Sequence, residues 1–331
     1  MSIQPRSLLG ALLTAASLSL VAEPLPAPLG GPAFTEPSRE LVLPEEWRRR
    51  PIRRHGWAEG AEVAVTLDQH FYPALLPLIQ EYARARGVDV AVQEGTCGIS
   101  AGKLADREAD IGGFCCPAGE SDRLPGLRFH TIGIASLALL VHPDNPIAGL
   151  SLDQARAAFS GQTAYWREMP GGSERQGLVR TVARLHCKTR PGHWRLLLDN
   201  EDQFSPRLHE VSTIPDMVSA VGRARGAIGY EVLWMVASHA GQGRVKTLEL
   251  DGVSPADREA LIAGRYPLYR TLQVTTWGDG VARSAEADAL VAFLAANADR
   301  IDPRYAIVPV AALREAGWRF RGDELVGEPT R

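Results

Sequence analysis

The sequence predicts an α/β protein folded as two lobes, and two of its features lead to that prediction. The chain has 331 residues with 45% hydrophobic content, whereas a single hydrophobic core stops growing at about 250 residues. From residue 61 onward, short apolar segments alternate with stretches of helical periodicity. Such alternation is typical of parallel strands joined by right-handed crossover helices. We therefore expect each lobe to hold a mixed, mostly parallel sheet flanked by helices.

The first lobe is predicted from the segments that open this alternation. Its strands are expected at 62–68, 88–95 and 110–114, and its helices at 72–86 and 100–109. The longer helix has apolar residues at helical spacing, whereas the strand segments are short apolar runs. In sheets of this kind, ligands bind beyond the carboxyl ends of the strands. Three cysteines lie in turns at those ends.

The second lobe is bracketed by two long apolar segments, near 131–142 and 268–275. We expect these segments to be strands that cross between the lobes. The chain between them carries further elements: a helix at 151–161, a strand at 177–185, and a helix followed by a strand at 214–234. A last amphipathic helix is expected at 284–301. Lobe I is thus predicted to comprise residues 61–140 and 268–331, and lobe II residues 141–267.

The N-terminal region reads as an export signal followed by an arm. Arg6 precedes an uncharged, mostly apolar run that ends at Ala22, which is the pattern of a signal peptide and is too short to span a bilayer. Residues 1–22 are predicted to be removed, and residues 23–60, rich in proline and charge, to form a tether or irregular arm with a solvated basic run at 47–54. The mature protein is expected to be periplasmic and monomeric. A net charge of -3 gives no reason to expect nucleic acid as a partner.

Five segments resemble one protein family, in the family's order. They read "GTCGISAGKLADREADIGGF", "VHPDNPIAGLSLDQARAAFSG", "AYWREMPGG", "MVSAVGRARGAIGYEVL" and "YPLYRTLQV". Together they resemble the phosphate-type periplasmic solute-binding proteins of ABC transporters. The resemblance implies the type II periplasmic-binding-protein fold, in which two lobes joined by two crossing strands close by a hinge on a small ligand. It also implies a receiving partner, either a transporter permease or a membrane sensor.

The resemblance further implies which side chains line the pocket. In the family, loops at the amino ends of helices bind an anion through backbone N–H groups, hydroxyl side chains and an arginine. The matching positions of this chain are Thr66, His70, Thr96, Cys97, Ser100, Cys115, Cys116, Arg184, Cys187 and Thr189. Several polar positions of the family are therefore cysteines here. All four cysteines map to loops that face one cleft.

The cysteines favour a thiophilic ligand. Thiolates and imidazoles bind soft ions such as Cu(I) or Zn(II), and three thiolates would also suit a trivalent metalloid. We therefore predict a solute-binding protein without catalytic turnover that captures a soft metal ion or metalloid, and no other cofactor is indicated. The candidate ligands are Cys97, Cys115, Cys116, Cys187, His70 and His186.

Three other interpretations stay open at this point. Phosphate or another oxyanion could be held by backbone amides, Arg184 and the hydroxyl side chains. A structural disulfide could join Cys97 to Cys115 or Cys116, as is common in exported proteins. A thiol-dependent enzyme would use Cys187 as a nucleophile beside a histidine.

Overall fold

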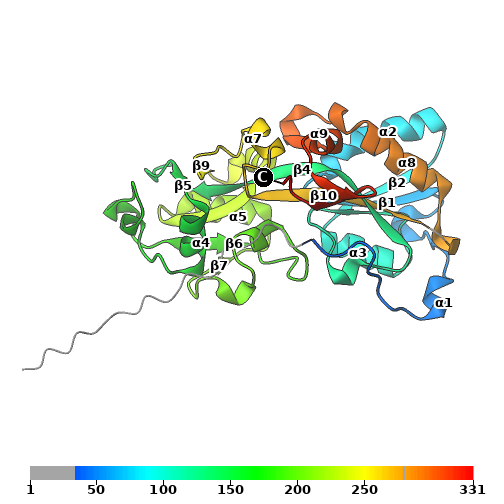
Figure 1. Cartoon of the computed structure of the whole chain (residues 1–331), viewed down its shortest axis with the longest axis horizontal. Helices are drawn as coiled ribbons and strands as arrows, with labels where there is room; N and C mark the ends of the chain where they lie inside the picture. The colour runs from blue at the N-terminus through cyan, green and yellow to red at the C-terminus, as the bar shows by residue number, and fades with distance from the viewer. Residues whose placement is uncertain (1–33, 279, 331) are drawn as a thin grey trace, which may run out of the picture.

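The computed structural model describes residues 34–278 and 280–330 (Figure 1). The predicted signal peptide, residues 1–22, and the first part of the predicted arm lie outside the described residues. Within the described ranges, no helix has both the length and the apolar character needed to cross a membrane.

The strands of the main sheet come from the whole length of the described chain. They are β1 Val63–Asp68, β2 Val90–Gly95, β3 Ile111–Phe114, β4 Leu127–Val141, β5 Gly149–Leu150, β6 Arg180–Ala183, β7 His209–Glu210, β8 Ala227–Val232, β9 Lys246–Leu250, β10 Tyr269–Trp277 and β11 Ile307–Pro309. A separate two-stranded sheet follows, formed by β12 Arg319–Arg321 and β13 Glu324–Gly327.

The helices alternate with these strands, as the sequence predicts for an α/β fold. They are α1 Glu45–Arg48, α2 Tyr72–Arg86, α3 Cys97–Ala105, α4 Leu152–Ser160, α5 Ile214–Arg223, α6 Leu233–Ser238, α7 Arg258–Ile262, α8 Ala285–Ala296 and α9 Val310–Glu315. Figure 1 shows α2 and α8 on one side of the sheet in the right-hand half and α3 on the other. Because both faces are covered there, every residue of β1 and of β3 is buried.

The two halves of the fold share one continuous run of strands. The order is β2-β1-β3-β10-β4-β8-β6-β7, and β1 is parallel to both of its neighbours. We keep the predicted division as names: lobe I contains β1, β2, β3 and β10, and lobe II contains β6, β7, β8 and β9. The fold class predicted from the sequence is therefore observed.

Strand β4 runs through both lobes. Its first part pairs with β10 up to Ser136, and its last part, from Leu137 to Val141, pairs with β8. Strand β10 lies beside β4 along its whole length, from Tyr269 to Trp277 (Figure 1). The two long apolar segments of the sequence are therefore neighbouring antiparallel strands at the junction of the lobes.

Helix α3 begins earlier than the sequence predicts, at Cys97 rather than at residue 100. Thr96 caps it, since its hydroxyl oxygen accepts a hydrogen bond from the Ile99 backbone N–H. The helix also ends earlier, because Arg107 adopts a left-handed conformation with φ 59°. This earlier start makes Cys97 the first residue of a helix whose amino end faces the junction of the lobes.

The described part of the N-terminal arm, residues 34–60, packs on lobe I and is no free tether. The Trp47 ring is buried, and the Arg107 guanidinium lies 3.9 Å from the Trp47 ring centroid and 4.0 Å from that of Trp277. Arg54, which was expected to be solvated, forms a 2.6 Å ion pair with the buried Asp110. The arm is irregular as predicted, but these contacts fix it to the lobe.

Candidate functional site

The site begins where β1 ends. The carboxylate of Asp68, the last residue of β1, accepts hydrogen bonds from the His70 backbone N–H at 2.9 Å and from His70 Nδ1 at 2.7 Å. Its second oxygen accepts from the Cys97 backbone N–H at 3.0 Å. An internal carboxylate therefore occupies the amino end of α3, a position that favours negative charge.

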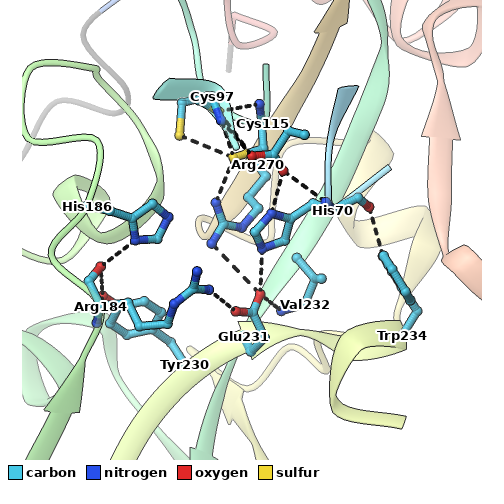
Figure 2. A network of polar contacts seen from close by, with 12 residues as sticks. His70, Cys97, Cys115, Arg184, His186, Tyr230, Glu231, Val232, Trp234 and Arg270 are labelled. Atoms are coloured by element: carbon cyan, nitrogen blue, oxygen red, sulfur yellow. Dashed lines mark hydrogen bonds and ion pairs between the residues drawn. The ribbon is translucent and has the colours of Figure 1, made fainter. Parts of the chain in front are cut away.

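Glu231 of β8 is the centre of the contacts between the lobes. Its carboxylate receives a hydrogen bond from Arg184 Nη1 at 3.1 Å and faces His70 Nε2 at 3.2 Å. Arg270 Nη2 lies 3.8 Å from the same carboxylate. Figure 2 shows Arg270 between this carboxylate and the thiols of lobe I. Residues of both lobes thus meet in one buried polar network.

These groups change one another's ionisation. Burial and Arg270 oppose protonation of His70, but Asp68 and Glu231 outweigh them and raise the pKa of His70 well above its ordinary value. Burial opposes ionisation of Glu231, yet His70 and the two arginines hold the pKa of that carboxyl well below its usual range. Burial also opposes ionisation of Asp68, but the charge and hydrogen bonds of His70 outweigh burial and lower the pKa of Asp68. Three cations therefore face the two carboxylates in this network.

The thiols of lobe I lie above this network. The sulfur of Cys97 is 3.2 Å from the sulfur of Cys115, which in turn is 4.0 Å from the sulfur of Cys116. The Cys97 thiol donates to Asp68 at 3.4 Å, and Arg270 Nη1 donates to the Cys115 sulfur at 3.3 Å. A carboxylate oxygen of Asp68 and the sulfurs of Cys97 and Cys115 lie within 4.8 Å of one another, which is a spacing that could hold an ion.

Cys187 brings the fourth thiol from lobe II. Hydrogen bonds with the thiols of lobe I, that of Cys115 foremost, lower the pKa of Cys187 far below its ordinary value. The residue is strained, with a left-handed φ of 61°, a conformation that concentrates at functional sites. Cys187 of lobe II therefore interacts with the thiols of lobe I, and a ligand-binding role for the four cysteines stays a prediction.

The other residues proposed from the sequence take different places. Thr66 and Ser100 are fully buried and hydrogen-bond to each other at 2.9 Å, so they join β1 to α3. Thr96 caps α3, as described above. Thr189 is exposed, which corrects the expectation that its side chain lines the cleft.

His186 lies at the edge of the cluster. Its Nδ1 donates to the Arg184 backbone carbonyl oxygen at 3.1 Å, and its ring centroid is 5.0 Å from that of His193. Burial lowers the pKa of His186 to about 4, so the imidazole is neutral at pH 7.

Sequence reasoning missed Glu231 and Arg270 as site residues. Both are fully buried, yet each is the one charged residue of its strand. Long charged side chains are almost never fully buried without a partner. A single charge within a strand segment was therefore the available signal, although its partners are distant in the sequence.

Several buried nitrogen atoms of the site have no hydrogen-bond partner among the described residues. They are Arg184 Nε, Arg270 Nε and Nη2, and both ring nitrogens of His193. Unpaired buried polar atoms are costly, because each has lost its hydrogen bonds to water. A ligand in the site could complete the hydrogen bonds of these nitrogen atoms.

A second contact between the lobes lies beside the thiols. Arg190 of lobe II donates to the Asp122 carboxylate of lobe I from Nε at 2.7 Å and from Nη2 at 2.6 Å, and both side chains are buried. The surrounding loops approach so closely that a Cβ on Gly119 would lie 2.7 Å from the Thr189 carbonyl oxygen. The structure is therefore closed at this edge of the junction.

A separate hollow of about 480 Å³ lies on lobe I, away from the thiols. His130, Arg128 and Arg283 contribute to its lining. The aspartates Asp288 and Asp323 line the same hollow, so its charges are mixed.

Comparison with known proteins places the fold. No family model matches the chain. Phosphate-binding protein PstS of Bacillus subtilis is 24% identical over 200 residues, which is 60% of this chain and 64% of that protein. The match thus spans less than two thirds of the relative.

Solved structures agree with this relation. A Clostridium perfringens protein, assigned as a phosphate ABC transporter substrate-binding protein and solved with bound phosphate, has a TM-score of 0.63 at 16% identity; the match covers 75% of this chain and 99% of that one. An ABC-type phosphate transport receptor from Vibrio cholerae has a TM-score of 0.59 at 19% identity, with the same coverage. The chain has the two-lobed type II periplasmic-binding-protein fold. The particular resemblance to phosphate-type substrate-binding proteins is likewise confirmed.

Proposed function

We propose that this chain is an exported solute-binding protein that captures a small ligand between its lobes for an ABC transporter. The observation that carries the proposal is the meeting of Arg184 from lobe II and Arg270 from lobe I at Glu231, with nitrogen donors of both arginines unpaired. Ligands of α/β sheets bind beyond the carboxyl ends of the strands. Asp68 is the last residue of β1, and Cys115 directly follows the last residue of β3.

An oxyanion of the phosphate type is the first candidate ligand. The names of the relatives support it, and so does the charge of the site. The cations that would attract an oxyanion are Arg184, Arg270 and the protonated His70, which meet around Glu231. Guanidinium groups offer several donors in a fixed geometry that suits tetrahedral oxyanions. Asp68 and Glu231 would restrict the ligand to a protonated oxyanion, because a dianion would face their repulsion.

Closure would follow from contacts that each lobe makes with the ligand and with the other lobe. Trp234 of α6 donates from its indole nitrogen to the His70 carbonyl oxygen at 3.1 Å, and its ring packs edge-on against Tyr305. These contacts, with the ion pair of Asp122 and Arg190, exist only when the lobes are together. A ligand that bridges the arginines would therefore shift the hinge toward the closed form.

A thiophilic ion is the second candidate, and the gathering of four thiols favours it. Soft ions such as Cu(I), Zn(II) or a trivalent metalloid prefer thiolates. The donor atoms of Cys97 and Cys115 are close together on lobe I, and Cys187 would add a sulfur from lobe II. This arrangement would also link ligand binding to closure.

Neither candidate requires catalysis, and we propose none. His186 directs its Nδ1 to a backbone carbonyl, and it directly precedes Cys187 in the chain. Neighbouring residues rarely orient as a nucleophile and its base. Turnover of any substrate that depended on Cys187 would contradict this part of the proposal.

Calorimetric titration separates the two ligands. Wild-type protein is titrated with inorganic phosphate and, under reducing and anaerobic conditions, with buffered Cu(I). If the ligand is an oxyanion, Arg184→Gln weakens phosphate binding by at least about 10-fold, since hydrogen bonds to charged groups contribute about 1.5–3 kcal/mol. If it is a soft ion, Cys187→Ser abolishes tight Cu(I) binding instead.

The matched control is Arg167→Gln, which removes an arginine from an exposed ion pair of lobe II. It should leave both affinities unchanged. Failure of the wild-type protein to bind either probe would contradict both ligand assignments.

A further inference from the structure

Two thiols of lobe I are placed to react with each other. The sulfurs of Cys97 and Cys115 are 3.2 Å apart, and both residues are fully buried. A disulfide needs about 2.05 Å, so the two sulfurs would have to approach by roughly 1 Å. Cys116 is the less suitable partner for Cys115, because the two are adjacent and their sulfurs are 4.0 Å apart.

The positions of the two residues in the fold would let a bond form without locking the hinge. Cys97 is the first residue of α3 and Cys115 directly follows β3, and both elements belong to lobe I. Their loops face lobe II, so opening of the lobes would expose the sulfurs to a reagent. A bond to Cys187, in contrast, would tie lobe I to lobe II.

We propose that Cys97 and Cys115 form a reversible disulfide, and that this bond switches the cleft from a soft-ion site to an anion site. The co-reactant is a disulfide, either oxidised glutathione or the disulfide form of a thiol oxidoreductase. One cysteine thiolate attacks the reagent and displaces one of its sulfurs as a thiolate. The second cysteine then attacks the mixed disulfide and displaces the other. Two electrons pass to the reagent, which leaves as two thiols carrying the two cysteine protons.

The bond changes what the site offers to a ligand. In the reduced form, Arg270 Nη1 donates to the Cys115 sulfur at 3.3 Å. A disulfide sulfur is uncharged and a weak acceptor, so oxidation frees this donor. It then joins Arg270 Nε and Nη2, which already lack hydrogen-bond partners. Oxidation also removes two thiol ligands, so anion binding strengthens while soft-ion binding weakens.

Disulfide mapping tests the bond itself. The protein is reduced, freed of reductant, incubated with oxidised glutathione, alkylated, digested and analysed by mass spectrometry. The proposal expects a Cys97–Cys115 linkage that dithiothreitol reverses. Cys97→Ser should abolish the linkage, whereas the control Cys116→Ser should retain it. Linkages only to Cys116 or Cys187, or four free thiols after oxidation, would overturn the proposal.

Affinities of the two forms test the switch, which rests on the function proposed above. We expect inorganic phosphate to bind the oxidised form at least 10-fold more tightly than the reduced form, and Cu(I) to bind the oxidised form at least 100-fold more weakly. Equal affinities in the two forms, or no binding of either probe to either form, would overturn the switch. The mapping requires no ligand, so failure of the ligand assignment is distinguishable from failure of the disulfide.

Discussion

The buried ion pair between Asp122 and Arg190 should control how readily the lobes close. The change Asp122→Asn keeps the shape of the side chain. It also keeps an oxygen that can accept the 2.9 Å hydrogen bond which the Gly119 backbone N–H donates to Asp122. It leaves the guanidinium of Arg190, a residue only 8% exposed, without its charged partner in the closed form. Removing one partner of a buried pair costs about 3–5 kcal/mol. In an open form both groups would be hydrated, so the cost falls on the closed form.

The expected result is a closed-to-open ratio reduced at least 100-fold, because about 3 kcal/mol corresponds to that factor. Small-angle X-ray scattering of the purified protein measures it as an increase in the radius of gyration. The control is Glu120→Gln, which breaks the neighbouring exposed pair with Arg39. An exposed pair contributes only about 0–1 kcal/mol, so this variant should scatter as the wild type does. Indistinguishable scattering from Asp122→Asn and Glu120→Gln would refute the reasoning.

Three further predictions concern the network and the arm. Glu231→Gln removes the carboxylate shared by two arginines and His70, and should lower the free energy of unfolding in urea by about 3 kcal/mol; a loss below about 1 kcal/mol, or one no larger than that of the exposed Glu249→Gln, would be contrary evidence. Because the pKa of His70 is raised in the folded state, its stabilisation is fully present below its unfolded value of about 6.5 and is lost as pH rises through the raised pKa. The melting temperature should therefore fall on the alkaline side in the wild type and fall less in His70→Asn; parallel profiles would argue against this. Trp47→Ala should release the arm, so that trypsin cleaves the arginine run at 48–54 at least 10-fold faster while the lobes stay folded; unchanged cleavage would contradict the docking.

The convergence of the cysteines could be predicted from the sequence because it depends on topology. Cys97 and Cys115 follow strands that end at the same edge of a parallel sheet, so assigning the strands is enough to bring the residues together. The family resemblance was needed to predict that a second lobe faces this edge and that Cys187 lies on it. Exact side-chain packing was not needed for this step.

The charged network could not be predicted in the same way. Glu231 and His70 are 161 residues apart, and their contact depends on how the two lobes meet. Nor does the sequence distinguish a hydroxyl that faces the cleft from one that packs inside. The hydroxyls of Thr66 and Ser100 form a hydrogen bond with each other between β1 and α3. The start of α3 was missed because Cys97 and Gly98 are weak helix formers, although Thr96 before them is a suitable cap.

The most direct test of the account is a crystal structure of the protein loaded with the ligand it retains from its own exported fraction. The account predicts ligand density at the junction of the lobes, in contact with Arg184 or Arg270 for an oxyanion, or with Cys97 and Cys187 for a soft ion. Density only in the hollow beside His130 and Arg283 on lobe I, with the junction empty, would contradict it.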